Sequence, residues 1–399
     1  MRPLYTLDDL EPQTLEGLVT LIRVDFNVPL DGDRVVDDTR IRAALPTIDE
    51  LRKAGARVVL MSHCGRPKGR PDPKYSLRPA ARSLAVLLGQ EVGFADDCIG
   101  ESAVSAIEAL QPGGICLLEN LRFHSGETEN DPEFADSLAA LGQAYVNDAF
   151  GTAHRAHASV VGVPQRKDAR AAGRLMVAEA KSLGRLLGNP ERPFAAIVGG
   201  AKIDSKVGTV MNLLPRIDAL ILGGGMANTF LAAQGHDTAN SLVEADKVAV
   251  ATHILDEASR RDIQVYLPVD VVVVESLERI DSAKTVAADS IPAGTMAVDI
   301  GIASREIAAE KIAQCQTVLW NGPMGVFETP PFDAGTLAIA GAMARCPGYT
   351  VIGGGETVAA AKTADVLDHL GHVSTGGGAS LEFLAGETLP GIAVLEKPS

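Results

Sequence analysis

Several features that mark common classes of protein are missing from this sequence. Its five cysteines form no CxxC pair and no pattern of a disulfide framework, which indicates a reducing compartment. No uncharged apolar run reaches about 18 residues and the N-terminal segment has no apolar signal core, so we expect a cytoplasmic protein that does not enter a membrane. The formal net charge of −15 argues against nucleic-acid binding and favours a monomer.

The chain is too long for one ordinary hydrophobic core. At 399 residues, two domains are the better expectation. Apolar runs rich in Val, Ile and Leu alternate with helical stretches, and several runs are apolar on both faces, as in parallel strands covered by helices on each side. The sequence therefore predicts an α/β fold with two doubly wound parallel-sheet (Rossmann-like) domains joined by a helical hinge.

The predicted elements locate the domain boundary. Strands are predicted at residues 19–24, 57–62, 115–119, 144–148, 194–198, 219–222, 264–274, 296–300, 317–320, 349–352 and 372–374. Helices are predicted at residues 40–54, 77–89, 102–110, 132–142, 206–213, 244–260, 304–313, 333–345 and 356–369. The alternation is weakest where a charged helical stretch stops at a Gly-Asn-Pro turn. The predicted organisation is a first domain at 1–172, a connecting helix and hinge at 173–193, and a second domain at 194–388.

Basic residues follow the strands of the first half. Residues 1–190 contain 17 arginines and residues 191–399 contain 7. Ligands of open parallel sheets bind beyond the carboxyl ends of the strands, and an arginine fork binds carboxylate and phosphate oxygens in a bidentate fashion. We interpret the group as a basic cup for a small phosphorylated acid, formed by Arg23, Asp25, Asn27, Arg40, His63, Arg66, Arg122 and Arg155. The alternative is a set of separate salt bridges that tie loops to helices.

The histidines of this half suggest two further roles that we do not favour. His63 could act as a general base, and His154 with His157 could bind a metal ion. Neither has a matching carboxylate or a third ligand at a telling spacing, so anion contacts or structural roles fit better.

Glycines follow the strands of the second half, where they let backbone N–H groups approach a polyphosphate. Lys202 and Lys206 follow the first of these turns, and we expect them on one face of a helix, where their mutual repulsion favours a bound polyphosphate. The loop at 320–328 ends in Glu328, a carboxylate suited to ribose hydroxyls. The glycine turns at 353–357 and 374–380 each precede a predicted helix. Solvated lysines and ordinary loop glycines are the plain alternative.

From these residues alone, more than one class of protein remains open. Two anion-binding devices on one chain favour an enzyme that moves a group between two anionic ligands. A non-catalytic two-domain protein that closes on an anion is the alternative. A nicotinamide dehydrogenase is less favoured, because no GxGxxG with an acidic residue about 20 positions further on follows the first strands.

The sequence resembles the phosphoglycerate kinases along almost its whole length. The matching stretches are RVDFNVP at 23–29, SHCGRP at 62–67, LENLRFH at 118–124, NDAFGTAHRAH at 147–157, GGAK at 199–202, WNGPMGVFE at 320–328, GGG at 353–355 and STGGGASLE at 374–382. The resemblance implies a glycolytic and gluconeogenic enzyme. Its reaction would be the reversible, Mg²⁺-dependent transfer of the ATP γ-phosphoryl group to the carboxylate of 3-phosphoglycerate, giving 1,3-bisphosphoglycerate and ADP.

The resemblance also implies roles for single residues. Arg40 would face the reacting carboxylate, and residues 389–399 would return to the first domain. Phosphoglycerate would be held by Asp25, Asn27, Arg40, His63, Arg66, Arg122 and Arg155. Catalysis would further use Lys202, Gly376, Gly377 and Gly378. The nucleotide would be bound by Lys202, Lys206, Glu328, Gly354, Gly355, Glu356 and Thr357, with Glu356 near Mg²⁺.

The chain departs from the usual pattern of that family at a few positions. Glu356 stands where the family generally has Asp, which adds a methylene to the expected metal or phosphate contact. Cys64 replaces a common Leu, and Asn228 replaces a common Tyr. Neither of these two changes removes a matched substrate contact, so only the role of Glu356 is placed in doubt.

Overall fold

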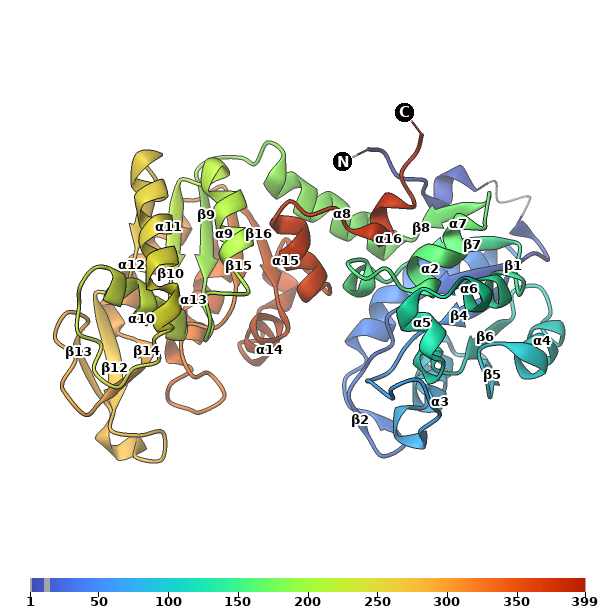
Figure 1. Ribbon diagram of the computed structural model, residues 1–399, viewed down its shortest axis with the longest axis horizontal. Helices are drawn as coiled ribbons and strands as arrows, with labels where there is room; N and C mark the ends of the chain where they lie inside the picture. The colour runs from blue at the N-terminus through green and yellow to red at the C-terminus, as the bar shows by residue number, and fades with distance from the viewer. Residues whose placement is uncertain (1, 11–14, 399) are drawn as a thin grey trace. The chain divides into compact units, whose positions relative to one another are not determined.

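Two six-stranded parallel sheets organise the computed structural model, one in each half of the chain (Figure 1). The structure describes residues 2–10 and 15–398, so residues 1, 11–14 and 399 of the predicted first domain lie outside the described residues. Contacts divide the chain into two compact units, Met1–Lys181 with Thr388–Ser399 and Ser182–Glu387. The two parallel sheets confirm the predicted α/β fold class.

The first unit places its strands in the order β5-β6-β4-β1-β7-β8. The four predicted strands of this half all form, and Ile22 of β1 lies opposite Leu60 of β4 and Val146 of β7. The short strands β5 and β8 were not predicted, because three residues are too few to show a periodicity. In sheet order the strands are β5 Gly93–Ala95, β6 Ile115–Leu118, β4 Arg57–Met61, β1 Val19–Arg23, β7 Ala144–Asn147 and β8 Arg170–Ala172. A two-stranded hairpin is formed by β2 Leu30–Asp31 and β3 Arg34–Val35.

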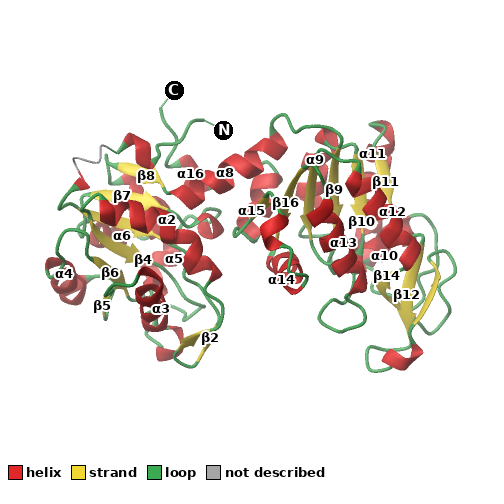
Figure 2. Ribbon diagram, turned by 180° about the vertical axis from the view of Figure 1, so that it is seen from behind, coloured by secondary structure: helices red, strands yellow, loops and turns green. Residues whose placement is uncertain are grey.

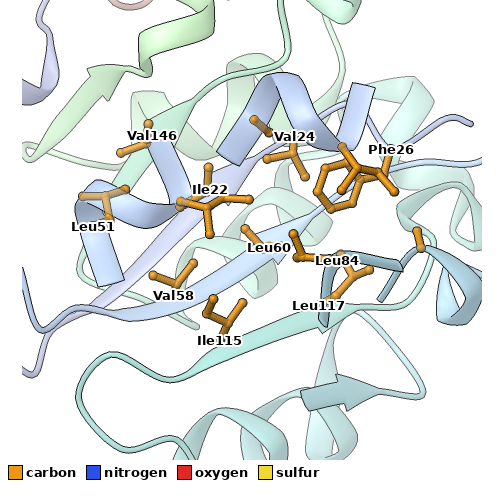
Figure 3. Packing of buried hydrophobic residues seen from close by; sticks show 14 of the residues in the cluster. Ile22, Val24, Phe26, Leu51, Val58, Leu60, Leu84, Ile115, Leu117 and Val146 are labelled. Atoms are coloured by element: carbon orange, nitrogen blue, oxygen red, sulfur yellow. The ribbon is translucent and has the colours of Figure 1, made fainter. Parts of the chain in front are cut away.

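The core of the first unit lies between the sheet and the helices α2 (Thr39–Lys53) and α3 (Arg78–Leu88). Figure 3 shows Ile22 and Leu60 of the sheet near Leu84 of α3. These three side chains are completely removed from solvent. Each buried side chain of this size contributes about 1.5–3 kcal/mol of transfer free energy. The core thus holds the strand ends, and the loops that follow them, in fixed places.

The second unit has the sheet order β11-β10-β9-β15-β16-β17 and a separate antiparallel sheet, β13-β12-β14. The predicted strand at 264–274 is wrong, because it is two strands, β11 and β12, in different sheets. Pro268 lies between them and lacks the N–H that a continuous strand would donate. The parallel strands are β9 Phe194–Val198, β10 Ala219–Leu222, β11 Gln264–Tyr266, β15 Thr317–Asn321, β16 Tyr349–Gly353 and β17 His372–Val373. The antiparallel strands are β12 Asp270–Val274, β13 Lys284–Ala287 and β14 Met296–Ile300.

Helices lie on both sides of each parallel sheet (Figure 2). In the first unit the remaining helices are α4 Gly100–Glu108, α5 Ser125–Glu129, α6 Pro132–Ala139, α7 Val163–Gln165 and α16 Pro390–Ala393. In the second they are α9 Val207–Leu213, α10 Gly224–Ala233, α11 Val248–Arg260, α12 Ile302–Ala313, α13 Ala334–Arg345, α14 Gly355–Thr363 and α15 Gly378–Leu384. The predicted helix at 356–369 is interrupted, because Asp365 has a φ of 55° and a separate 3₁₀ turn follows. Among the described residues, no helix combines the length and the apolar composition needed to cross a membrane.

Helix α8 (Arg174–Leu187) leads from the first unit into the second. Its first turn is anchored by the buried Asp148, whose Oδ1 accepts hydrogen bonds from the N–H groups of Leu175 and Met176 at 2.9 and 3.1 Å. A carboxylate is favourable at a helix N-terminus. Burial nevertheless raises the pKa of Asp148 from 3.8 to about 6. The start of this helix therefore depends on a carboxyl group that resists ionisation.

We expect Asp148→Asn to change how stability depends on pH. Because folding raises the pKa of Asp148, its stabilising contribution is complete below about pH 3.8 and is lost as the pH rises through about 6. Asparagine keeps the accepting oxygen and does not ionise. Between pH 4 and 7 the difference in unfolding free energy should therefore move in favour of the variant by on the order of 3 kcal/mol. Urea unfolding of both proteins at several pH values measures it, and a difference that does not change with pH would contradict the prediction.

The C-terminal segment packs on the first unit. The N–H of Gly391 donates to the carbonyl of Ala153 at 2.8 Å, and the N–H of Tyr5 donates to the carbonyl of Leu395 at 2.9 Å. Arg170 of β8 donates to the carbonyl of Val394 at 3.0 Å. These contacts join both ends of the chain to the same unit.

Candidate functional site

The loop after β1 and the start of α2 meet at an ion pair. Arg40 Nη1 donates to Asp25 Oδ2 and to the carbonyl oxygen of Asn27, both at 3.0 Å. The side chain of Asn27 in turn accepts the N–H of Gly65 at 2.9 Å, which joins this loop to the one after β4. Arg40 uses only Nη1 in these contacts, and 36% of its side chain stays exposed. Its guanidinium can therefore also contact a ligand.

His63 is buried among cationic groups. Its Nδ1 lies 3.1 Å from Arg23 Nη2 and 3.8 Å from Asp25 Oδ1. Burial, followed by the charges of Arg23, Arg122, Arg155 and Arg40, holds the pKa of His63 well below its usual value. The imidazole is therefore neutral. Arg23 itself is completely buried and donates Nε to Ser159 Oγ at 2.9 Å, so it supports the site from inside the protein.

Three of the predicted arginines share one cavity. Arg66, Arg122 and Arg155 line a space of about 530 Å³, together with Lys68 and His157. Arg122 donates Nη1 to the carbonyl of Gly65 at 2.7 Å, while its buried Nε has no hydrogen-bond partner. Burial, and then the charges of Arg155 and Arg23, lower the pKa of Arg122 to about 10. Mutual repulsion of this kind is relieved by a bound anion.

In the second unit, three glycine-rich turns pack against one another after β9, β10 and β15. The N–H of Gly200 donates to the carbonyl of Pro323 at 2.7 Å, and the N–H of Gly224 donates to the carbonyl of Met324 at 2.9 Å. A Cβ on Gly199 would lie 2.2 Å from the oxygen of Pro323. The expectation that these N–H groups point to a ligand is therefore wrong for Gly199, Gly200 and Gly224, whose N–H groups bond to other parts of the protein.

Lys202 and Lys206 do not share a helical face, because α9 begins only at Val207. Residues 201–206 form bends and turns between β9 and α9, so neither lysine lies within the helix. Lys202 is exposed. Lys206 Nζ donates to the carbonyl of Asn321 at 3.1 Å and also contacts its side-chain oxygen. Burial lowers the pKa of Lys206 to about 8, although the charge of Glu356 opposes this change.

A largely apolar cavity of about 370 Å³ lies beside these turns. Of the predicted site residues, Glu328 and Glu356 line it. The sequence interpretation did not name its apolar wall, because uncharged side chains carry no chemical signal. This wall includes Leu242, Pro268, Val271, Met296 and Val298. Part of it, including Val271 and Val298, belongs to the antiparallel sheet that the sequence analysis did not predict.

Asp299, at the end of β14, is another lining residue that sequence reasoning missed. Its Oδ2 accepts the N–H of Gly335 at 2.7 Å and pairs with Arg305 Nη2 at 2.9 Å. Burial raises the pKa of Asp299 to about 7. This carboxyl group joins β14 to the start of α13 and supports the cavity from behind.

The glycine turn at 353–357 is connected to the same region by buried hydrogen bonds. Thr357 Oγ1 accepts the N–H of Gly322 at 2.7 Å, and Asn321 Nδ2 donates to the carbonyl of Gly353 at 2.8 Å. Gly354 has a φ of 93°, which favours glycine there. Asp204 pairs with Lys247 at 2.6 Å.

The turn at 376–378 leads directly into α15. Gly377 has a φ of 51° and precedes the first residue of that helix, Gly378. The N–H of Gly376 donates to Ser374 Oγ at 3.2 Å, and Ser374 Oγ lies 2.6 Å from Ser380 Oγ. The two serines therefore hold the glycine turn in one conformation.

The sequence matches the model of a known protein family over most of its length. The model of the family described as "Phosphoglycerate kinase" matches residues 7–387. The chain belongs to the phosphoglycerate kinase family. It is therefore a kinase, an enzyme that transfers phosphoryl groups, and neither a binding-only protein nor a nicotinamide dehydrogenase.

Curated relatives and solved structures agree with the family. The phosphoglycerate kinase of Pelotomaculum thermopropionicum is 53% identical over 384 residues, which cover 96% of this chain and 98% of that protein. The phosphoglycerate kinase of Moorella thermoacetica is 51% identical over 390 residues, covering 98% of each. The structure of phosphoglycerate kinase from Coxiella burnetii has a TM-score of 0.89 and 39% identity, covering 98% of this chain and 99% of that one. The resemblance found from the sequence is thus confirmed.

Proposed function

We propose that the chain catalyses the reversible transfer of the ATP γ-phosphoryl group to the carboxylate of 3-phosphoglycerate. The products are 1,3-bisphosphoglycerate and ADP, as in glycolysis and gluconeogenesis. The observation that carries this proposal is the cationic cavity of the first unit, which Arg66, Arg122 and Arg155 line and where Arg122 and Arg155 repel each other. A small, highly charged anion would offset this repulsion.

The reaction needs no general base in this site. A carboxylate is ionised at neutral pH, so one of its oxygens attacks the γ-phosphorus directly. The bond from that phosphorus to the bridging oxygen breaks, and its electron pair leaves with ADP. Catalysis then depends on position and on positive charge at the transferred group. A neutral, buried His63 agrees with this, because it can hydrogen-bond to substrate without taking a proton.

The phosphoglycerate site would lie in the first unit. Arg66, Arg122 and Arg155 would bind the phosphate, because their guanidinium groups line one cavity. Asp25 and Asn27 would bind the hydroxyl group on the middle carbon of the substrate. Arg40 would reach the reacting carboxylate with the part of its guanidinium that Asp25 leaves unused.

The nucleotide site would lie in the second unit. The apolar cavity would receive the adenine ring, and Glu328 on its wall would bind ribose hydroxyls. Lys206 and the turn Gly354, Gly355 and Thr357 would lie at the phosphates. Lys202, which is exposed, would reach the transferred group together with the N–H groups of Gly377 and Gly378. Gly376 would shape this turn, because its own N–H donates to Ser374 Oγ.

Mg²⁺ is the metal that the family implies. Glu356 fits a role as its ligand, because its carboxylate lies on the cavity wall near Lys206 and carboxylate oxygen is what this ion prefers. When bound with the nucleotide, the ion would neutralise charge on the β- and γ-phosphates. The protein would contribute the position of Glu356 in the first turn of α14.

Transfer requires the two substrates to meet, so we propose that the two units close during turnover. The predicted first domain, 1–172 with 389–399, would carry phosphoglycerate, and the predicted second domain, 194–388, would carry the nucleotide. The connecting segment 173–193, which contains α8, would act as the hinge. Its start is fixed by Asp148, and Arg185 near its end stacks 4.2 Å above the ring of Tyr349. Closure would exclude water from the reacting groups.

We also propose a monomeric enzyme of the cytoplasm. All five cysteines are free, which agrees with a reducing compartment. Light scattering of the purified chain tests the oligomeric state, and a dimer at working concentrations would contradict the monomer.

A coupled assay tests the proposed reaction. Purified chain, ATP and Mg²⁺ should release ADP only when 3-phosphoglycerate is added. Removal of Mg²⁺ with a chelator should stop the release, and an excess of Mg²⁺ should restore it. Release without the acid would indicate a different acceptor, and release in the chelator would contradict the role of the metal.

Lys206→Met should raise the KM for nucleotide much more than it lowers kcat. The lysine is charged below its pKa of about 8, so wild-type KM for ATP should rise as the pH increases through that value. The methionine variant should have a high KM that no longer follows this titration. Initial rates at pH 6.5–9.5 measure both. An unchanged KM with a lowered melting temperature would show that the contact with Asn321 is only structural.

A further inference from the structure

A second cluster of chemically active side chains lies beyond strands β5 and β6. Asp97 and Cys98 follow β5, and His124 follows the short 3₁₀ turn after β6. The two strands are parallel neighbours, with Phe94 opposite Leu117, so these residues emerge at the same edge of the sheet. Their ligand atoms all lie within 4.8 Å of one another. None of the roles proposed above uses any of the three.

The three side chains together favour one class of ligand. A carboxylate, a thiol and an imidazole supply oxygen, sulfur and nitrogen, which is a combination typical of zinc-class ions and not of Mg²⁺ or Ca²⁺. We propose that Asp97, Cys98 and His124 bind one divalent transition-metal ion of the zinc class. The fourth position of a tetrahedral ion would be left to water.

The distances suit such an ion after a small movement. Metal–ligand bonds of about 2.0–2.3 Å in a tetrahedron place the ligand atoms about 3.3–3.8 Å apart. His124 Nε2 and Asp97 Oδ1 now lie 2.7 Å apart and share a hydrogen bond. They would separate slightly, while the widest pair in the cluster would draw together. Both side chains are partly exposed, Asp97 at 45% and His124 at 31%, so the more exposed Asp97 carboxylate can make most of this movement.

The surroundings of the cluster attract cations. Asp97 and His124 line a cavity of about 330 Å³, whose wall also carries the carboxylates of Asp72, Asp96 and Glu119 and a single guanidinium, that of Arg78. Arg78 is paired with Asp96. The cavity therefore has a negative balance of charge and an opening for an ion.

Cys98 and His124 are positioned for ligation. The Cys98 thiol is buried, and its sulfur lies within 4.8 Å of the other two ligand atoms. Coordination would release the S–H proton to solvent and place a cation between two anionic ligands. The His124 ring stacks on Phe134 of α6, with centroids 5.3 Å apart. This contact would fix the plane of the imidazole, as neighbours of metal ligands usually do.

The plain alternative is that the hydrogen bond from His124 to Asp97 only joins two loops. Titration of the full chain with Co²⁺ separates the two readings, since thiolate coordination produces a charge-transfer band in the near ultraviolet. We expect this band to saturate at one equivalent and to disappear when Zn²⁺ is added. Cys98→Ser should abolish it, and Asp97→Asn and His124→Asn should each weaken Co²⁺ binding about tenfold or more. Cys116→Ser is the matched control, because Cys116 is buried in the neighbouring strand β6 and lies outside the cluster.

Four results would overturn the proposal. These are no band in the wild-type chain, a band that persists in Cys98→Ser, a band that depends on Cys116, and unchanged affinity in either the Asp97 or the His124 variant. Melting curves of each apoprotein show whether it is folded. If Cys98→Ser does not fold, the Co²⁺ affinity of His124→Asn tests the proposal, because His124 is partly exposed and its variant should fold. A folded His124→Asn with wild-type affinity would contradict a three-ligand site.

Discussion

Arg40→Ala should lower kcat by roughly 10²–10³-fold, about 3–4 kcal/mol of transition-state stabilisation. In the proposed reaction, Arg40 is the guanidinium that faces the attacking carboxylate and the charge that develops during transfer. Asp25 and the carbonyl of Asn27 hold its Nη1 at 3.0 Å, so the group is positioned before substrate arrives. A fixed donor of this kind requires no reorganisation during the reaction.

The same substitution should disturb folding very little. The Arg40–Asp25 pair is partly exposed, and such pairs contribute about 0–1 kcal/mol. Arg42→Ala is the matched control, because Arg42 lies two residues further along α2 and pairs with Asp38 on an exposed surface. Steady-state rates and melting curves of both variants are the measurements. A near-normal kcat in Arg40→Ala would remove the residue from the proposed mechanism, and an equal loss in Arg42→Ala would point to damage of the helix.

The strand ends were the most predictable part of this chain. Runs such as residues 19–24 and 57–62 are apolar on both faces, which is what central parallel strands require. Once those runs are strands, the residues after them must lie at one edge of the sheet. The sequence could therefore anticipate that Arg66, Arg122 and Arg155 come near one another, and they line one cavity.

The antiparallel sheet of the second unit could not be predicted in the same way. Its strand β12 follows β11 after only Leu267, Pro268 and Val269, and the apolar run across both looks continuous. Its partners β13 and β14 follow at separations that no local pattern specifies. Asp299 was missed for a related reason, since its role depends on Gly335 and Arg305, which it meets only in the folded chain.

The glycines were located correctly but explained only in part. From the sequence, we expected these glycines to let their backbone N–H groups approach a bound polyphosphate. In the structure, the N–H of Gly199 donates to the carbonyl of Asn321 at 3.0 Å, and its missing side chain makes room for the backbone at Pro323. The close packing of the turn after β9 against the loop after β15 therefore explains why position 199 requires glycine.

Gly199→Ala should destabilise the second unit by about 2–4 kcal/mol and raise the KM for nucleotide. The added Cβ would lie 2.2 Å from the oxygen of Pro323 and 2.8 Å from that of Gly322. Both are backbone atoms, so neither can turn away as a flexible side chain would. The loop 321–325 must move instead, and it forms part of the wall of the nucleotide cavity.

The control for this change is Gly184→Ala, at a helical position in α8 where a Cβ meets nothing within 4 Å. That substitution should stabilise the chain by about 0.5–1 kcal/mol, because alanine restricts the unfolded chain and suits a helix. Thermal and urea unfolding of the two variants, with nucleotide KM beside them, give the comparison. If Gly199 served only to present its N–H, alanine would keep that group and stability would not fall. Wild-type unfolding in Gly199→Ala would therefore refute close packing as the reason for the glycine, and with it the view that the three turns support one another.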